Sequence, residues 1–194
     1  MSYVYVDYLN NIKAVGEKLK DTQKDMNKIM SALKHIQNNG NGRVFLCGNG
    51  GSAGTASHMA CDLFKMCGIT AISLNENPPL TTAIINDEGW ENLYTYQLQN
   101  YDIDAGDILI AFSVHGGVGK DKGEEWSQNL NKAIEHVNNH NGTTIGFAGF
   151  DGGAMKDLCD YCIIVPVDST PIVEAYHVVL HHFIASELQT GERK

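Results

Sequence analysis

The chain has 194 residues, of which 43% are hydrophobic and 19% charged, with a formal net charge of −9 at neutral pH. This size and composition are typical of one globular domain, and the negative charge argues against nucleic acid or an anionic membrane as a general partner. No apolar run reaches the roughly 20 residues that span a bilayer, and the N-terminus lacks the basic start of a signal peptide. We therefore expect a cytoplasmic protein.

Apolar residues recur at helical spacing from Tyr3 to Gln37, which predicts one or two amphipathic N-terminal helices. The glycine- and asparagine-rich segment 38–42 ends this pattern. The run Arg43–Cys47 then predicts a short buried strand.

The rest of the chain alternates between short apolar runs and amphipathic segments. Further strands are predicted at Ala71–Leu74, Asp107–Phe112, Thr144–Phe147 and Tyr161–Val165. Helices are predicted at Ser52–Met66, Trp90–Tyr101, Glu124–Asn138, Gly153–Leu158 and Thr170–Leu188. This alternation implies parallel βαβ units, and uniformly apolar strands imply a sheet that is covered on both faces. We predict an α/β fold, a three-layer α/β/α sandwich with a five-stranded, mostly parallel sheet plus the N-terminal helices.

Ligands bind such sheets beyond the carboxyl ends of the strands, where the strand order reverses. The loops at these ends are Gly48–Ser52, Asn75–Gly89, Ser113–Gly123 and Ala148–Gly153. Within them, the Pro78-Pro79 and Gly152-Gly153 pairs predict turns.

The segment Gly48-Asn49-Gly50-Gly51-Ser52 joins a predicted strand to a helix of small residues. Glycines let the backbone approach a ligand, and a helix start offers unpaired N–H groups, so the loop suits an anion. The alternative is a tight turn in which Ser52 caps the helix. A second glycine-rich loop, Ser113–Lys120, also follows a strand, and its His115 and Lys120 are either phosphate contacts or solvated surface groups.

Five cysteines, an odd number without a secretion signal, predict reduced thiols. Cys159 and Cys162 form a C-x-x-C pair, a spacing that can bind zinc or carry redox chemistry. No second pair accompanies it, and Cys162 opens a predicted strand. Ordinary buried or edge thiols are therefore favoured over a metal or redox pair.

Ionisable residues gather on two predicted helices. His58 and Asp62 are four residues apart and share one helix face. The otherwise apolar C-terminal helix carries Glu174, His177, His181 and His182. Burying polar groups of an apolar helix costs folding free energy unless these groups are paired with other polar groups or serve a function. One such histidine would favour a structural role, whereas several groups on two helices favour a site.

These motifs, with Asn86-Asp87 and Thr170–Glu174, resemble the sugar isomerase (SIS) family and within it the sedoheptulose 7-phosphate isomerases, or phosphoheptose isomerases. The likeness covers nearly the whole chain. It implies a flavodoxin-like SIS domain over residues 1–194, with residues 1–40 used in oligomerisation and residues 41–194 as the α/β core. It also implies a homotetramer with active sites at subunit contacts.

The activity implied by the resemblance is conversion of sedoheptulose 7-phosphate to D-glycero-D-manno-heptose 7-phosphate for heptose and glycoconjugate biosynthesis, without a nucleotide cofactor. Asp62 and His182 would be the acid and base pair, and His58 and Glu174 would join them around a zinc ion. His181 is the alternative to His182. Substrate and phosphate contacts would come from Asn49, Gly50, Gly51, Ser52, Asn86, Asp87, Ser113, His115, Gly116, Lys120 and Ser127.

The chain departs from the family pattern at three places. Asp62 stands where Glu is usual, and Glu174 stands where Gln is usual. Two carboxylates with two imidazoles suit a divalent ion, zinc above all. The phosphate loop, usually Ser-Thr-Ser-Gly-Asn-Ser, keeps Ser113 and Gly116, and its last Ser is expected nine residues late, as Ser127.

Two other functions stay open. The lengthened loop favours a specialised sugar, so the chain can be an isomerase of another ketose phosphate. A non-catalytic SIS protein, which binds a sugar phosphate or acts as a replication-initiation partner, is a different class. Such proteins tend to lose the carboxylate and the late histidine, so the presence of Asp62 and His182 favours the enzyme.

Overall fold

The computed structural model describes residues 4–117 and 126–190; Lys120, a predicted phosphate contact, lies outside these ranges. The strands are β1 (Val44–Gly48), β2 (Ala71–Ser73), β3 (Ile108–Phe112), β4 (Thr143–Gly149) and β5 (Tyr161–Val165). The helices are α1 (Tyr5–Leu19), α2 (Gln23–Asn39), α3 (Gly51–Cys67), α4 (Pro78–Glu88), α5 (Leu93–Asn100), α6 (Gln128–Asn139), α7 (Met155–Leu158) and α8 (Thr170–Leu188), with 3₁₀ turns η1 (Lys20–Thr22) and η2 (Trp90–Asn92).

The described strands form one five-stranded sheet in the order β2-β1-β3-β4-β5, and every neighbouring pair is parallel. This confirms the predicted sheet. The chain builds outward from β1 in both directions, so the strand order reverses between β1 and β3. Gly48 at the end of β1 pairs with Phe112 at the end of β3. The loops that follow these two strands therefore start level and side by side.

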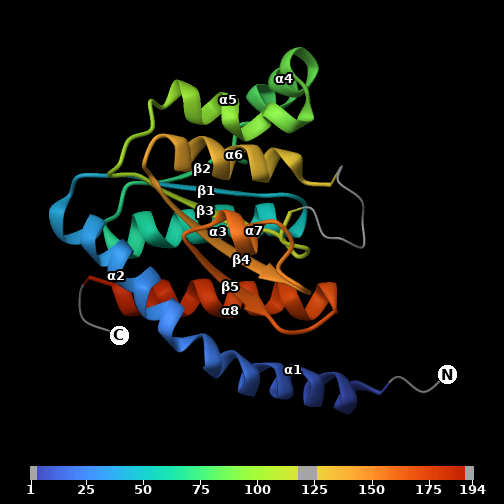
Figure 1. The fold of residues 1–194 in the computed structure, drawn as a ribbon. Helices are drawn as coiled ribbons and strands as arrows, with labels where there is room; N and C mark the ends of the chain where they lie inside the picture. Colours follow the sequence, from blue (N-terminus) through green and yellow to red (C-terminus); the bar gives the residue numbers. More distant parts are fainter. Residues whose placement is uncertain (1–3, 118–125, 191–194) are drawn as a thin grey trace.

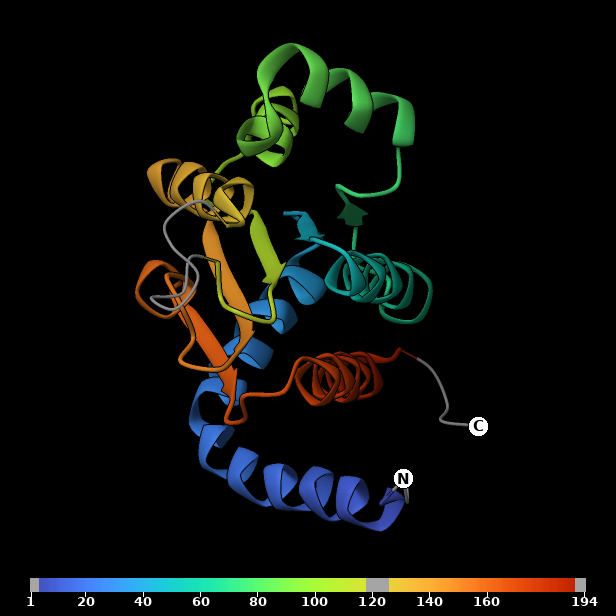
Figure 2. The ribbon, with the colours of Figure 1, turned by 90° about the vertical axis from the view of Figure 1, so that its right-hand side faces the viewer.

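Alternate residues of the strands face two separate layers of helices, which confirms the three-layer sandwich (Figure 2). Val44 and Leu46 of β1 pack with residues of α2, α3 and α8. Phe45 and Cys47 point to the opposite face and pack with residues of α5, α6 and α7. The strands are apolar on both faces because both faces are buried.

The N-terminal helices were predicted, and they differ in how they pack. The apolar stripe of α2 is buried against the sheet, and the helix ends at Gly40, which adopts φ 65°. In contrast, α1 lies on the outside of α8, below it in Figure 1, and buries only Val15. It is held there by the hydroxyl of Tyr176 on α8, which donates a hydrogen bond to the carbonyl of Ile12. None of the helices in the described ranges has both the length and the apolar content needed to cross a bilayer.

Two local predictions are wrong. The Pro78-Pro79 pair does not form a turn but opens α4, because a proline needs no hydrogen-bond partner for its nitrogen in the first turn of a helix. Asn77 caps this helix by accepting a hydrogen bond from the backbone N–H of Leu80 at 3.1 Å. The helix predicted over Glu124–Asn138 is not helical at Trp126 and Ser127 and begins at Gln128, while Glu124 lies outside the described residues. The predicted turn at Gly152 and Gly153 is confirmed, since both glycines have positive φ.

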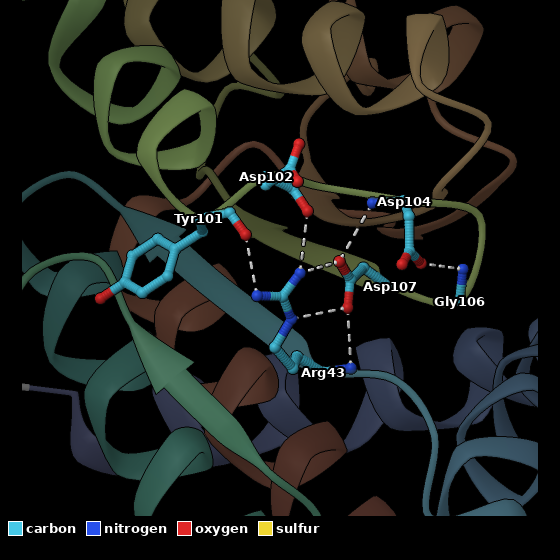
Figure 3. A network of polar contacts seen from close by, with 6 residues as sticks. All are labelled: Arg43, Tyr101, Asp102, Asp104, Gly106 and Asp107. Carbon is cyan, nitrogen blue, oxygen red and sulfur yellow. Dashed lines mark hydrogen bonds and ion pairs between the residues drawn. The ribbon is translucent and has the colours of Figure 1, made fainter.

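A polar network anchors the amino ends of β1 and β3 (Figure 3). The guanidinium of Arg43 donates to both carboxylate oxygens of Asp107, at 3.0 and 2.6 Å, and to the carbonyls of Tyr101 and Asp102. The same carboxylate accepts from the backbone N–H groups of Arg43 and Asp104. This network fixes the two strands whose opposite ends carry the glycine-rich loops.

Candidate active site

A small pocket lies at the carboxyl ends of β1 and β3, where the strand order reverses. Its volume is about 130 Å³. It is lined by Asn49, Ser52, Phe112, Ser113, Val114, His115, Gly117, Trp126 and Ser127. Five of the predicted phosphate contacts therefore lie together at one spot, as expected for loops that follow neighbouring parallel strands.

The first loop turns tightly into α3. Gly50 is the residue before the helix and has φ 59°, and no side chain caps this helix start, so the interpretation of Ser52 as its cap is wrong. A Cβ on Gly48 would lie 2.6 Å from the backbone of Ser52, so the turn requires a glycine there. Ser52 is buried and lines the pocket at the positive end of the helix. The loop has the geometry of an anion-binding turn.

The second loop is held by its own serine. Ser113 accepts a hydrogen bond from the backbone N–H of Gly117 at 3.0 Å. Gly116 and Gly117 both have positive φ, a conformation that favours glycine. The ring of His115 packs against Phe150, 4.2 Å between centroids, and its buried Nδ1 has no hydrogen-bond partner among the described residues. His115 also lines the pocket.

Two residues of this region were missed as site candidates. Asn129 at the start of α6 and Tyr94 on α5 are buried and contact the first loop. The hydroxyl of Tyr94 donates to the carbonyl of Gly48 at 2.6 Å, and the amide of Asn129 pairs with that of Asn49. Neither residue stands in a glycine-rich motif. The available signal was a polar residue at a core-facing position of a predicted helix.

Imidazoles and a carboxylate converge between α3 and α8. Asp62 Oδ2 lies 3.7 Å from Nε2 of His58, 3.8 Å from Nδ1 of His181 and 3.5 Å from Nδ1 of His182. His181 is fully buried, whereas the side chain of His182 is 52% exposed. The predicted meeting of Asp62 with His182 is thus a feature of the single chain, and His181 belongs to the same cluster.

The cluster has the chemistry of a metal site. One nitrogen each from His58, His181 and His182 lies within 4.8 Å of the others. Burial, with His182 and His58 nearby, lowers the pKa of His181 to about 4, so its imidazole is neutral at neutral pH. Neither of its ring nitrogens has a hydrogen-bond partner in the part of the chain that the structure describes. A neutral imidazole beside a carboxylate is a ligand that zinc accepts.

Glu174 lies apart from this cluster in the single chain. Its carboxylate lies over Gly51, where a Cβ would come within 2.5 Å of Oε1. Along α8 it is eight residues, or about 12 Å, from His182. Its role as a metal ligand stays a prediction. Asn86 and Asp87 are exposed on α4 and hydrogen-bond to each other at 2.7 Å, so their contact with substrate also stays a prediction.

The C-x-x-C pair consists of free thiols. Both sulfurs lie against Gly146, where a Cβ would be 3.0 Å from Cys159 and 3.1 Å from Cys162. Burial raises the pKa of both, that of Cys162 to about 12. The thiolate that metal binding or redox chemistry needs is therefore disfavoured, in agreement with the expectation of ordinary thiols.

Comparison with known proteins places this arrangement in a family. The profile of the SIS domain matches residues 7–149. A protein of Campylobacter jejuni named phosphoheptose isomerase 2 is 35% identical over an alignment of 193 positions, which spans 95% of this chain and 90% of that one. A phosphoheptose isomerase of Helicobacter pylori is 33% identical over 92% of this chain and 90% of its own length.

Solved structures give the same result for the fold. A phosphoheptose isomerase from Francisella tularensis superposes with a TM-score of 0.85 at 22% identity, over 97% of this chain and 98% of that one. Sheet order, glycine-rich loops and sequence relatives therefore agree, and the chain belongs to the SIS domain family.

Proposed function

We propose that this protein is a phosphoheptose isomerase, which converts sedoheptulose 7-phosphate to D-glycero-D-manno-heptose 7-phosphate for heptose and glycoconjugate biosynthesis. The observation that carries the proposal is the meeting of Asp62, His58 and His182 from two helices, together with a pocket of glycine-rich loops at the N-terminus of α3, the helix that carries Asp62. The names of sequence relatives over most of the chain support the same reaction.

Aldose–ketose isomerisation needs a base at carbon and an acid at oxygen. Asp62 takes a proton from C1 of the ketose, and His182 gives one to the carbonyl oxygen at C2, which yields the enediol. The hydroxyl at O1 then returns a proton to His182, and C2 receives the proton from Asp62. The exposure of His182 leaves it open to substrate, while the 3.5 Å contact with Asp62 keeps the two groups on one face of the sugar.

The distance between the pocket and the catalytic pair favours a site that two chains share. Asp62 follows Ser52, which lines the pocket, by ten residues on α3, about 15 Å along the helix axis at ~1.5 Å per residue. A chain of seven bonds joins C2 of a heptulose to the phosphorus at its far end. At ~1.2 Å per bond that chain reaches about 8 Å when extended. The substrate is shorter than this separation, which supports an active site completed by a second chain.

We propose zinc as the metal, held by His58, Asp62 and His182, with buried His181 beside them and Glu174 as the further predicted ligand. Bound zinc would supply Lewis-acid stabilisation of negative charge on the sugar oxygens. Elemental analysis of the purified protein should find about one zinc per chain. His58→Ala should lower that content, while His35→Ala on the surface of α2 should not. A full zinc content in the His58 variant would contradict this ligand set.

The proposed oligomer is a homotetramer with shared active sites, in which residues 1–40 contribute contacts. Its support is exposed apolar surface: Tyr5 and Val6 are 70% and 64% exposed on α1, and Val179 and Phe183 are exposed beside the imidazole cluster on α8. Such surface is typical of an interface. Light scattering should give the mass of four chains, and the double variant Tyr5→Lys with Val6→Lys should reduce that mass.

We also propose that the protein is cytoplasmic, which its free thiols support.

The test of the activity is product NMR with purified protein and a panel of ketose phosphates. Sedoheptulose 7-phosphate should give a heptose 7-phosphate, and His182→Ala should lower turnover by about a thousandfold. His136→Ala, a half-buried histidine on α6, is the matched control and should retain activity. Preference for another ketose phosphate would identify the alternative substrate. Near-normal turnover by a folded His182 variant would contradict the assigned role, and absence of turnover in the wild type would favour a non-catalytic SIS protein.

A further inference from the structure

Asn129 is fully buried at the start of α6, where its side chain faces the loop after β1. Its Nδ2 donates to Oδ1 of Asn49 at 2.9 Å, and Nδ2 of Asn49 donates back to Oδ1 of Asn129 at 3.0 Å. The two amides thus form a closed pair, in which each group donates once and accepts once. A flipped amide would place oxygen against oxygen and nitrogen against nitrogen, so the pair admits one relative orientation.

Further contacts connect the amide pair to both loops of the pocket. Nδ2 of Asn49 also lies 3.4 Å from Oγ of Ser127, and the hydroxyl of Tyr94 lies 3.1 Å from Oδ1 of Asn49. Asn49 belongs to the loop between β1 and α3, while Ser127 and Asn129 follow β3 and open α6. The amide pair therefore joins, across 80 residues of sequence, the two segments that line the pocket.

The same contacts limit what Asn49 can do for a ligand. Its amide is engaged by Asn129 at both its oxygen and its nitrogen, so its side chain has little hydrogen-bonding capacity left for a phosphate. What Asn49 supplies is the position of the glycines that follow it. A shift of about 1 Å in such a loop can cost up to a hundredfold in function.

We propose that Asn129 is a positioning residue for phosphate binding, which acts through Asn49 to hold the Gly48–Ser52 loop in its binding geometry. This inference rests on the proposed function only in naming the ligand as the phosphate of a sugar phosphate. Asn129 itself is behind the loop and does not touch the phosphate.

The first experiment compares Asn129→Ala and Asn129→Leu with Asn139→Ala, an exposed control at the far end of the same helix. The Leu variant keeps the side-chain volume but cannot form hydrogen bonds with Asn49. It provides the test if the Ala variant fails to fold. Both Asn129 variants should raise KM for the ketose phosphate and the inhibition constant of inorganic phosphate about tenfold, with kcat within a factor of three. Asn139→Ala should change none of these. Unchanged phosphate inhibition in folded Asn129 variants would overturn the proposal.

A double-mutant cycle tests the route through Asn49. If Asn129 acts through Asn49, then Asn129→Leu should weaken phosphate inhibition less than twofold when Asn49→Ala is already present. Independent effects that multiply would mean that Asn129 acts in another way, which contradicts the proposal.

A binding measurement separates this inference from the proposed reaction. Inorganic phosphate at tens of millimolar should raise the Tm of the wild type, and that shift should shrink at least twofold in Asn129→Leu. Phosphate binding without turnover of any ketose phosphate would remove the proposed function and leave the inference standing. Equal Tm shifts in wild type and variant, or no shift in the wild type, would overturn the inference whatever the turnover.

Discussion

The two ends of strands β1 and β3 are built in opposite ways. At the amino ends, Asp107 is 2% exposed and accepts hydrogen bonds from Arg43 and from backbone N–H groups. At the carboxyl ends the chain passes into glycine-rich loops that line a pocket, and the buried Nδ1 of His115 has no partner among the described residues. One end has its polar groups satisfied by the protein, whereas the other has a pocket and an unsatisfied polar atom.

This contrast separates the residues that fold the protein from those that act. A satisfied buried network contributes to stability, and an orphaned buried nitrogen costs free energy that a ligand, an ion or a bound water recovers. Changes at the amino ends should therefore appear as unfolding free energy. Changes at the carboxyl ends and in the imidazole cluster should appear as turnover or substrate affinity.

The largest expected effect is that of Asp62→Asn on turnover. The asparagine keeps the shape of the side chain but cannot accept a proton, so kcat should fall about a thousandfold. Steady-state kinetics measure the loss, and circular dichroism checks the fold.

Asp25→Asn on α2 is the matched control for this substitution. Asp25 pairs with Lys28 at 2.9 Å on the surface, where an ion pair contributes little, so both activity and stability should stay near wild type. Comparable turnover in the Asp62 and Asp25 variants would remove Asp62 from the chemistry.

The next effect is that of Arg43→Met on stability. Methionine preserves the apolar stem but removes every guanidinium contact, which leaves the carboxylate of Asp107 buried with backbone donors alone. Breaking a buried pair in this way should lower the free energy of unfolding by about 3 kcal/mol. Urea denaturation at fixed protein concentration measures this loss of unfolding free energy. The kcat and KM of the folded protein should not change; a change in either would show that the amino ends also serve the site.

The sequence predicted the layers, the sheet and most strand positions, because uniformly apolar runs that alternate with amphipathic segments admit few other folds. It also predicted that Asp62 and His182 meet, on the strength of a family resemblance. The local sequence also predicted a tight glycine turn at Gly48–Ser52, because glycine accepts the positive φ that Gly50 adopts before α3.

What the sequence did not predict depends on contacts between distant segments. Asn129 became a site residue only because α6 packs beside the loop after β1, and its neighbours do not signal that contact. The pair Pro78-Pro79 is compatible with either a turn or the start of a helix, and the cap from Asn77 stabilises the helix start. The placement of Glu174 over Gly51 follows from how α8 lies against α3, which helical periodicity alone does not fix.

A third, smaller effect is the dependence of stability on pH through His177. Burial lowers the pKa of this imidazole to about 4 in the folded protein, against an ordinary value of 6.5. The unfolded chain therefore binds more protons between these values, so His177 contributes stability that is fully present above pH 6.5 and is lost as the pH falls toward 4. Its contribution should decrease by about 2 kcal/mol between pH 7 and pH 4.5.

Denaturation curves at several pH values test this expectation in His177→Gln. The variant should lose less stability on acidification than the wild type, while His35→Gln on the surface of α2 controls for the removal of one imidazole. Parallel pH curves for wild type and His177→Gln would show that this buried histidine does not titrate as its surroundings require.

The smallest effect is that of Tyr94→Phe, which removes one polar anchor from the carboxyl end of β1, as Arg43→Met removes one from its amino end. Its hydroxyl donates to the carbonyl of Gly48, which also accepts from Nδ2 of Asn75 at 3.0 Å and so keeps a partner. The free energy of unfolding should fall by only about 1 kcal/mol. Because Gly48 begins the phosphate loop, KM for the ketose phosphate should still rise about threefold, whereas Arg43→Met leaves KM alone despite its larger cost in stability. Measuring KM and unfolding free energy for both variants compares the two ends of one strand directly. Equal KM values in the two variants would mean that Tyr94, like Arg43, contributes only to stability. The residues that affect substrate binding would then begin further along the loop, after Gly48.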